Sequence, residues 1–213
     1  MKEVRRGRMG YKELNPTTML SPLPCVLVTC GEPGKGTNAM TVAWTGIVNT
    51  HPPMLSISVK PERYSHDLIL KSREFCVHPA DREHIRAVDF CGVKSGKSVD
   101  KISLMGLQLE DSGLESAPAV SGFPICIPCV LRDVYPLGSH DLFLGEIQKI
   151  LIRDDLMDDN GSVHLERAGL VAYSHGLYQE LGTILGFFGF SVARKETYER
   201  RMRNLKDAHI VRG

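Results

Sequence analysis

The sequence has no excess of charge of either sign. Its 26 Lys and Arg residues stand against 25 Asp and Glu residues, which gives a formal net charge of +1. A surface that follows nucleic-acid phosphates needs a basic excess, so no nucleic-acid partner is expected. No apolar run approaches the roughly 20 residues of a membrane-spanning helix. The basic start at residues 1–8 is followed by no apolar core of a signal peptide, and we therefore expect a cytoplasmic protein with no membrane partner.

Several motifs of catalytic and metal sites are also missing. No pair of histidines has metal-ligand spacing, and no Ser-His-Asp or Cys-His arrangement can be assigned, so we expect no metal site. The segment at residues 31–37 superficially resembles a phosphate-binding loop. In that motif the lysine is followed by Ser or Thr and then by a helix, whereas Gly36 follows Lys35 here and the next segment predicts a strand. A hairpin turn is the better interpretation.

The cysteines do not form the framework of a small secreted protein. Two of the six, Cys126 and Cys129, have the spacing of a redox motif, but there is no second pair at zinc-ribbon spacing. The surrounding run at residues 123–131 predicts a strand, in which positions three apart lie on opposite faces. Two buried, reduced thiols are therefore expected, and redox or metal chemistry is the alternative.

The 213 residues, of which 42% are hydrophobic, suit one large domain or two small ones with a packed core. Strands outnumber helices in the pattern, and strands often follow one another directly. This favours a mainly β protein with short helices, as a β-barrel or an α+β arrangement, over a doubly wound sheet. The expected strands are residues 24–30, 38–46, 54–59, 75–78, 106–109, 123–131, 141–152 and 170–173. The expected helices are residues 66–71 with Ser65 as N-cap, a helix capped by Asp81 that ends near Cys91, residues 98–102, and a peripheral helix or partly disordered tail from Arg194.

The stretch at residues 58–66 is the first candidate for chemistry. A strand ends there, Lys60 and Arg63 follow, and a helix begins. Free N–H groups at a helix N-terminus and a planar guanidinium suit a monophosphate. The alternative is a solvated turn. Residues 95–101 repeat this pattern, with a surface loop as the alternative, and His140 lies alone at the mouth of a strand.

Five segments together resemble one family. They are Asn-Ala-Met-Thr-Val-Ala-Trp at 38–44, Pro-Pro-Met-Leu-Ser-Ile-Ser-Val at 52–59, Arg-Tyr-Ser-His at 63–66, Ser-Gly-Lys-Ser-Val-Asp-Lys at 95–101 and Ser-His-Asp-Leu-Phe-Leu-Gly-Glu at 139–146. In this order they resemble the flavin reductase-like family of FMN-binding split β-barrel proteins, which includes the flavoredoxins. The resemblance spans about residues 18–192 and implies one domain over residues 1–213 with a C-terminal extension.

The resemblance implies an FMN site near the interface of a homodimer. In it the strand at 38–44 runs along the isoalloxazine ring, residues 58–66 hold the phosphate, and the loop at 95–101 closes over the flavin. The implied FMN-binding residues are Asn38, Met40, Thr41, Val42, Ala43, Trp44, Ser58, Val59, Lys60, Arg63, Tyr64, Ser65, His66, Ser95, Gly96, Lys97, Asp100, Lys101 and His140. No side chain is assigned a catalytic role, because the flavin itself carries the redox chemistry.

The implied activity is that of an NAD(P)H-dependent flavin oxidoreductase, which passes electrons to free flavin, ferric complexes or a protein partner. An FMN electron carrier without its own pyridine-nucleotide site is the alternative, and a split barrel that has lost its flavin is a third. No Rossmann fingerprint is present, so the choice between NADH and NADPH is not visible. The segments at residues 175–182 and 186–191 are typical of flavoredoxin-like members and favour a tightly bound FMN. The apolar run at residues 184–190 predicts interface or core.

Overall fold

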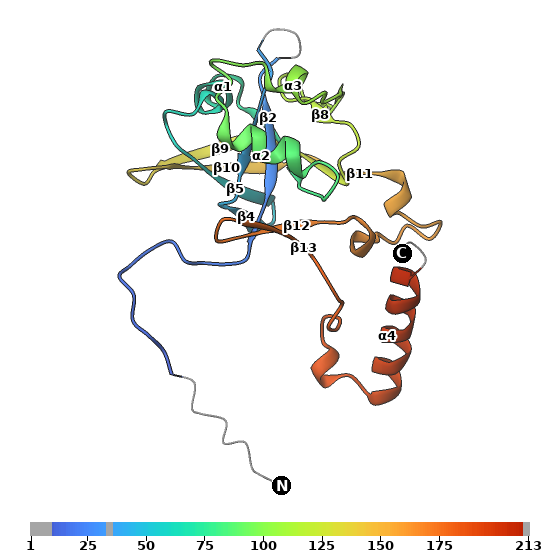
Figure 1. Ribbon diagram of the computed structural model, residues 1–213. Coiled ribbons are helices and arrows are strands. Elements are labelled where there is room, and N and C mark those ends of the chain that lie inside the picture. Colours follow the sequence, from blue (N-terminus) through green and yellow to red (C-terminus); the bar gives the residue numbers. More distant parts are fainter. Residues whose placement is uncertain (1–9, 33–35, 211–213) are drawn as a thin grey trace.

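The computed structural model describes residues 10–32 and 36–210 (Figure 1). The basic start of the chain and the centre of the expected hairpin turn, including Lys35, lie outside the described residues. The centre of the fold is one antiparallel sheet that curls into half a barrel. The segment before the sheet and the C-terminal helix both extend away from it.

The large sheet has the strand order β3-β2-β6-β9-β10-β5-β4, with β11 paired to β9. Every neighbouring pair in it is antiparallel. Its strands are β2 (Val26–Cys30), β3 (Asn38–Val42), β4 (Thr45–Thr50), β5 (Pro53–Val59), β6 (Glu74–Pro79), β9 (Ile125–Pro136), β10 (Asp141–Ile147) and β11 (Leu151–Ile152). β3 and β4 are therefore the two edges of the sheet.

Two small sheets and short helices complete the fold. One small sheet joins β1 (Leu23–Pro24), β12 (Val171–Ser174) and β13 (Leu177–Glu180), and the other joins β7 (Leu109–Glu110) and β8 (Ala119–Val120). The α-helices are α1 (Tyr64–Ser72), α2 (Ile85–Val93), α3 (Lys101–Leu104) and α4 (Lys195–Ile210). The 3₁₀ turns are η1 (Asp154–Leu156), η2 (Leu165–Arg167) and η3 (Phe190–Val192).

The core lies on both faces of the sheet, and β2 shows why. Its alternate residues Val26 and Val28 belong to the cluster that includes Ile69 of α1, whereas Leu27 belongs to the cluster that includes Val88 of α2. Alternate strand residues point to opposite faces, so a continuous apolar run indicates a strand covered on both sides. α1 and α2 provide that cover, and each of them begins or ends at the candidate site.

The mainly β class with short helices is confirmed, and several boundaries differ from those expected. The expected strand at 38–46 is interrupted at Ala43 and Trp44, and the strand at 141–152 is interrupted after Ile147. The strand expected at 106–109 is only the two residues of β7, and β9 runs five residues past the expected end at Leu131. The tail from Arg194 contains helix α4.

Three helix caps show why local sequence was insufficient. Ser65 is not the N-cap of α1: the helix begins at Tyr64, two residues earlier than expected, and Arg63 is the N-cap. The Ser65 hydroxyl instead accepts a hydrogen bond from Asn38 Nδ2 at 2.7 Å. The third helix begins at Lys101, later than expected, because Asp100 caps it by accepting from the Ser103 backbone N–H at 3.1 Å.

Asp81 is not the N-cap of α2 either. It accepts from the His84 backbone N–H at 2.8 Å and so stabilises the turn before the helix, whereas His84 is the N-cap and α2 begins at Ile85.

The expectation of buried, unpaired thiols is confirmed. All six cysteines are free and buried. Cys129 lies in the core cluster of α1, and Cys126 lies in a separate cluster with Cys76 on the other face of the sheet. Burial raises the pKa of Cys129, and a hydrogen bond with Cys76 together with burial raises the pKa of Cys126. Both thiols are thus held in the protonated, unreactive form.

His78 generates a prediction about pH. This fully buried imidazole has both nitrogens engaged, since Nδ1 lies 3.3 Å from the Leu27 carbonyl oxygen and Nε2 accepts from the Val120 backbone N–H at 3.0 Å. Burial lowers its pKa to about 4. Between about pH 6.5 and pH 4 the unfolded chain therefore binds more protons than the native protein, and stability falls as the pH falls through this window, by roughly 3 kcal/mol in all.

We expect His78→Gln, which keeps one donor and one acceptor, to flatten this dependence. Chemical denaturation at a series of pH values between 7 and 4 measures it. His51→Gln, at an exposed position, is the control and should retain the wild-type slope. An equally steep loss of stability in His78→Gln would contradict the assignment.

Candidate functional site

A cavity of about 190 Å³ lies where the bend between β3 and β4 meets the end of β5. We call it the basic cavity, because its charged lining residues are Lys60 and Arg63 and no carboxylate belongs to its described lining. Its lining is Met40, Thr41, Val42, Ala43, Trp44, Ser58, Val59, Lys60, Arg63 and His140. All ten belong to the FMN-binding set implied by the sequence.

The two cations are placed by the turn that follows β5. The Arg63 backbone N–H donates to the Lys60 carbonyl at 3.0 Å, which closes the turn, and both residues line the basic cavity. Arg63 Nη1 donates to the Gly92 carbonyl at the end of α2, at 3.2 Å. Lys60 lies 3.7 Å from Glu62, but both side chains are exposed, so this ion pair is weak. The guanidinium is thereby fixed in direction by one N–H, and its remaining donors are suited to an anion.

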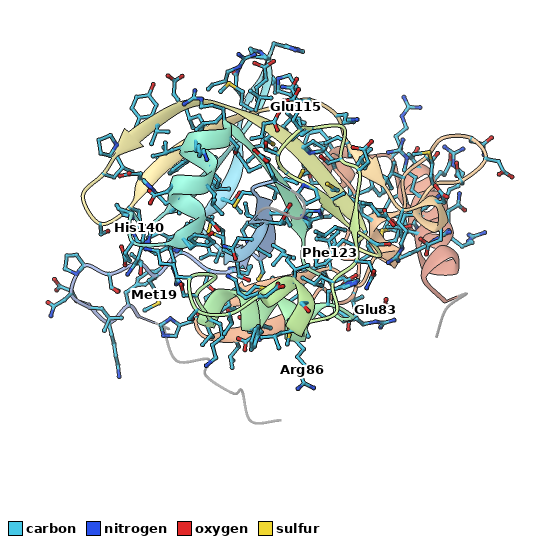
Figure 2. All side chains as sticks on the ribbon, turned by 90° about the horizontal axis from the view of Figure 1, so that it is seen from above. Met19, Glu83, Arg86, Glu115, Phe123 and His140 are labelled. Atoms are coloured by element: carbon cyan, nitrogen blue, oxygen red, sulfur yellow. The ribbon has the colours of Figure 1, made fainter. Side chains whose placement is uncertain are left out.

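Two aromatic rings also line the cavity. Trp44 and His140 have ring centroids 4.7 Å apart and are tilted by 41° to each other, and Ser139 Oγ lies 3.0 Å from His140 Nδ1. Figure 2 shows His140 at the rim of the molecule, near the end of the long strands. The partly exposed indole of Trp44, which the imidazole packs against, suits stacking against a planar ligand.

Not every residue of this lining offers its side chain to a ligand. The Thr41 hydroxyl donates to the Val88 carbonyl of α2. His66 lies outside the cavity: it is buried, and its Nε2 lies 2.8 Å from Asp141 Oδ2 at the start of β10. This contact fastens the first turn of α1 to the strand that follows His140. His66 therefore stabilises the site without lining the basic cavity.

A second cavity, of about 370 Å³, lies beside the basic cavity. Arg63 lines the basic cavity, and its chain neighbour Tyr64 lines the second one. We call it the loop cavity, because the loop at residues 95–100 covers it. Its lining is Gly36, Thr37, Asn38, Tyr64, Gly96, Val99, Asp100, Lys101, Ile102 and Leu109. The close packing of Gly96 against Asn38 and Tyr64 leaves no space for a Cβ atom at Gly96.

Lys101 holds this loop in place through its buried side chain. Its side chain is buried, and Nζ donates to the carbonyls of Cys91 at 3.2 Å and Lys94 at 3.3 Å. Burial lowers the pKa of its amine. Because its hydrogen bonds go to the segment that joins α2 to the loop, Lys101 holds the loop in place over the cavity.

The structure thus divides the implied site instead of gathering it in one cavity. Ten of the residues line the basic cavity, and five line the loop cavity. Ser65 and His66 are buried in the first turn of α1, and Ser95 and Lys97 are exposed on the loop. Sequence reasoning missed Gly92, whose carbonyl orients Arg63, and Asp141, the partner of His66. Asp141 stands directly after His140, so its carboxylate was a visible signal.

The model of the flavin reductase like domain matches residues 19–182. The chain belongs to the flavin reductase-like family. Flavoredoxin of Desulfovibrio vulgaris (Miyazaki F) is similar with a TM-score of 0.79 and 24% identity, over 86% of this chain and all of that one. An FMN-binding protein from Thermus thermophilus is similar with a TM-score of 0.67 and 24% identity, over 84% of this chain and 98% of that one. A flavin reductase of Pseudomonas putida is 23% identical over 134 residues, 63% of this chain and 75% of that protein.

These similarities confirm the expected fold, a flavin-binding split β-barrel. Members of the flavin reductase-like family bind flavin, and the basic cavity lies within the matched residues. Within the described part of the chain, no helix is long and apolar enough to cross a membrane.

Proposed function

We propose that this chain is an FMN-binding oxidoreductase that accepts a hydride from NAD(P)H and passes the electrons to an acceptor. The observation that carries the proposal is the basic cavity, whose described lining contains two cations and a pair of aromatic rings in contact, and no carboxylate. FMN has a phosphate at one end and a planar ring at the other. The two kinds of lining match these two ends.

The donor set fits the phosphate. A phosphate carries up to two negative charges, and Lys60, Arg63 and the Ser58 hydroxyl supply charge and donors on one side of the cavity. β3 is an edge strand, so its outward backbone groups are not used by the sheet and can bond the polar rim of the ring. We propose that Met40 to Trp44 hold the ring. Asn38, Tyr64 and the loop residues Ser95, Gly96, Lys97, Asp100 and Lys101 close the site, while Ser65 and His66 support it.

When bound, the flavin supplies the hydride and electron chemistry. The chain binds it, orients it and shields one of its faces, and no side chain of the site is assigned an acid–base role. The names of the similar proteins support FMN as the flavin, since one is described as an FMN-binding protein and another is a flavoredoxin. Flavoredoxin similarity also supports an electron carrier without a pyridine-nucleotide site as the alternative.

An absorption spectrum tests this proposal. We expect the purified protein to be yellow, with flavin bands that bleach on anaerobic addition of NADH or NADPH. A flavin spectrum that neither nucleotide bleaches would support the carrier instead. A colourless protein that takes up no added FMN would contradict flavin binding altogether.

Arg63→Ala should weaken FMN binding by about ten- to a hundredfold, because charge-assisted contacts to phosphate contribute roughly 1.5–3 kcal/mol. Fluorescence titration of the apoprotein with FMN measures this. Arg73→Ala is not a suitable control, since Arg73 bonds two carbonyls of β9. Arg86→Ala, on the far side of α2 from the cavity (Figure 2), is the matched control and should retain the wild-type affinity. Unchanged affinity in Arg63→Ala would place the phosphate elsewhere.

We propose further that the whole chain is one domain that acts in the cytoplasm as a homodimer. Edge strand β4 exposes Ile47 and Val48, at 67% and 51%. The run at residues 184–190, expected as interface or core, is not part of the core of the single chain, because Leu185 and Phe188 are exposed at 84% and 104%. Exposed apolar side chains on an unpaired edge and on an extending segment favour a second copy as their cover.

In this assembly dimerisation and flavin occupancy are coupled. We expect Ile47→Glu to shift the protein toward monomer and to lower its FMN content, because the charge would be desolvated in the interface. Light scattering with flavin fluorescence across a dilution series measures both. Val163→Glu, which removes an exposed apolar group from the loop between η1 and η2, is the control. A monomeric wild type with full flavin content would refute the shared site.

A further inference from the structure

A third cavity adjoins the basic cavity and is used by none of the assignments above. It has a volume of about 470 Å³ and lies between the N-terminal segment and the hairpin of β12 and β13. We call it the arm cavity. Its lining is Thr18, Met19, Leu20, Ser21, Leu23, Trp44, Tyr173, His175 and Gly176.

The walls of the arm cavity are fastened to each other. Leu23 pairs with Tyr173 in the antiparallel ladder of β1 and β12. The hydroxyl oxygens of Ser21, in the N-terminal segment, and Ser174, in β12, lie 2.8 Å apart. The N-terminal segment is therefore held against the hairpin on both sides of residue 22, and the cavity is a defined part of the fold.

Trp44 connects the arm cavity to the basic cavity, because its side chain lines both. His140, whose ring packs against Trp44, and Met19 of the arm lie on the same side of the molecule in Figure 2. A molecule in the arm cavity thus has the same indole as neighbour as a ligand in the basic cavity. A second reactant of the proposed function would be placed next to the first.

Charge distinguishes the two cavities. The basic cavity has Lys60 and Arg63, whereas the described lining of the arm cavity contains no Lys, Arg, Asp or Glu. Desolvating an anion without a cationic partner is costly. The aromatic rings of Trp44 and Tyr173 and the hydroxyls of Thr18 and Ser21 instead suit an uncharged planar molecule with carbonyl groups.

We propose that the arm cavity binds an uncharged quinone as electron acceptor of the proposed function, on which this assignment rests. The overall reaction balances: NAD(P)H, one proton and a quinone give NAD(P)⁺ and a hydroquinone. The quinone gains two electrons, and each of its two oxygens gains a proton. Ferric chelates and other anionic acceptors are disfavoured in this cavity.

The test compares two anthraquinones that differ in charge, 2-(hydroxymethyl)anthraquinone and anthraquinone-2-sulfonate. Trp44 is the single tryptophan of the chain, so quenching of its emission in the apoprotein reports binding in either of the two cavities that it lines. Equilibrium dialysis with FMN-loaded protein, in which the proposed function fills the basic cavity, isolates binding in the arm cavity. We expect the uncharged compound to bind about tenfold more tightly than the sulfonate, without displacing FMN.

Met19→Lys and Leu20→Lys place a cation in the cavity and should each shift this preference toward the sulfonate by about tenfold. Both positions are partly exposed, at 47% and 80%, so at least one variant should fold. Leu14→Lys, on the same segment but outside the cavity, is the control and should retain the wild-type preference.

Equal binding of both compounds by the wild type, displacement of FMN by the uncharged quinone, or an unchanged preference in folded Met19→Lys and Leu20→Lys would overturn the assignment. The two proposals fail separately. Suppose the protein takes up no FMN, but its apoprotein prefers the uncharged quinone and the two lysine variants shift this preference. That result would refute the flavin function, whereas the assignment of an uncharged quinone to the arm cavity would stand.

Discussion

The pairing of β5 with both β4 and β10 is the constraint on which the candidate site depends. Thr45 pairs with Ile57, and Asp141 pairs with Val59, so the end of β5 lies between the start of β4 and the start of β10. The Ser58 backbone N–H also donates to the Trp44 carbonyl at 2.9 Å. Three segments far apart in sequence therefore meet at one point, and each brings a part of the basic cavity: Trp44, the turn with Lys60 and Arg63, and His140.

Two contacts with the helices keep this junction in place. His66 joins α1 to the first residue of β10 through Asp141, and Arg63 joins the end of β5 to the end of α2 through the Gly92 carbonyl. The site is thus supported by regular elements on both faces of the sheet. Orientation of a bound group by packed strands and helices is more exact than orientation by loops, which is what a cofactor-dependent reaction demands of its protein.

Sequence predicted the fold class better than it predicted the arrangement of the candidate site. The alternation of apolar residues and serine at 54–59 identified β5, and a period of two placed Cys126 and Cys129 on opposite faces of β9. The cap at Ser65 was wrong because its hydroxyl bonds Asn38, which is 27 residues away in sequence. Likewise nothing in the local sequence shows that the Thr41 hydroxyl bonds the Val88 carbonyl. Side-chain partners set by long-range packing were beyond the reach of spacing and composition.

The buried thiols and the two adjoining cavities differ in the chemistry that each can support. Burial raises the pKa of Cys25 to about 11 and of Cys30 to about 12, so these thiols are not poised to exchange electrons. In the proposed function, redox chemistry belongs to a bound group that is retained while its reaction partners come and go. Charge-assisted contacts, as in the basic cavity, suit a retained anionic ligand, because each contributes more than a neutral hydrogen bond. The arm cavity, whose described lining has no Lys, Arg, Asp or Glu, suits a ligand that exchanges. We therefore propose that the separation of cations from the arm cavity is the physical basis for holding one ligand and releasing another at the same indole.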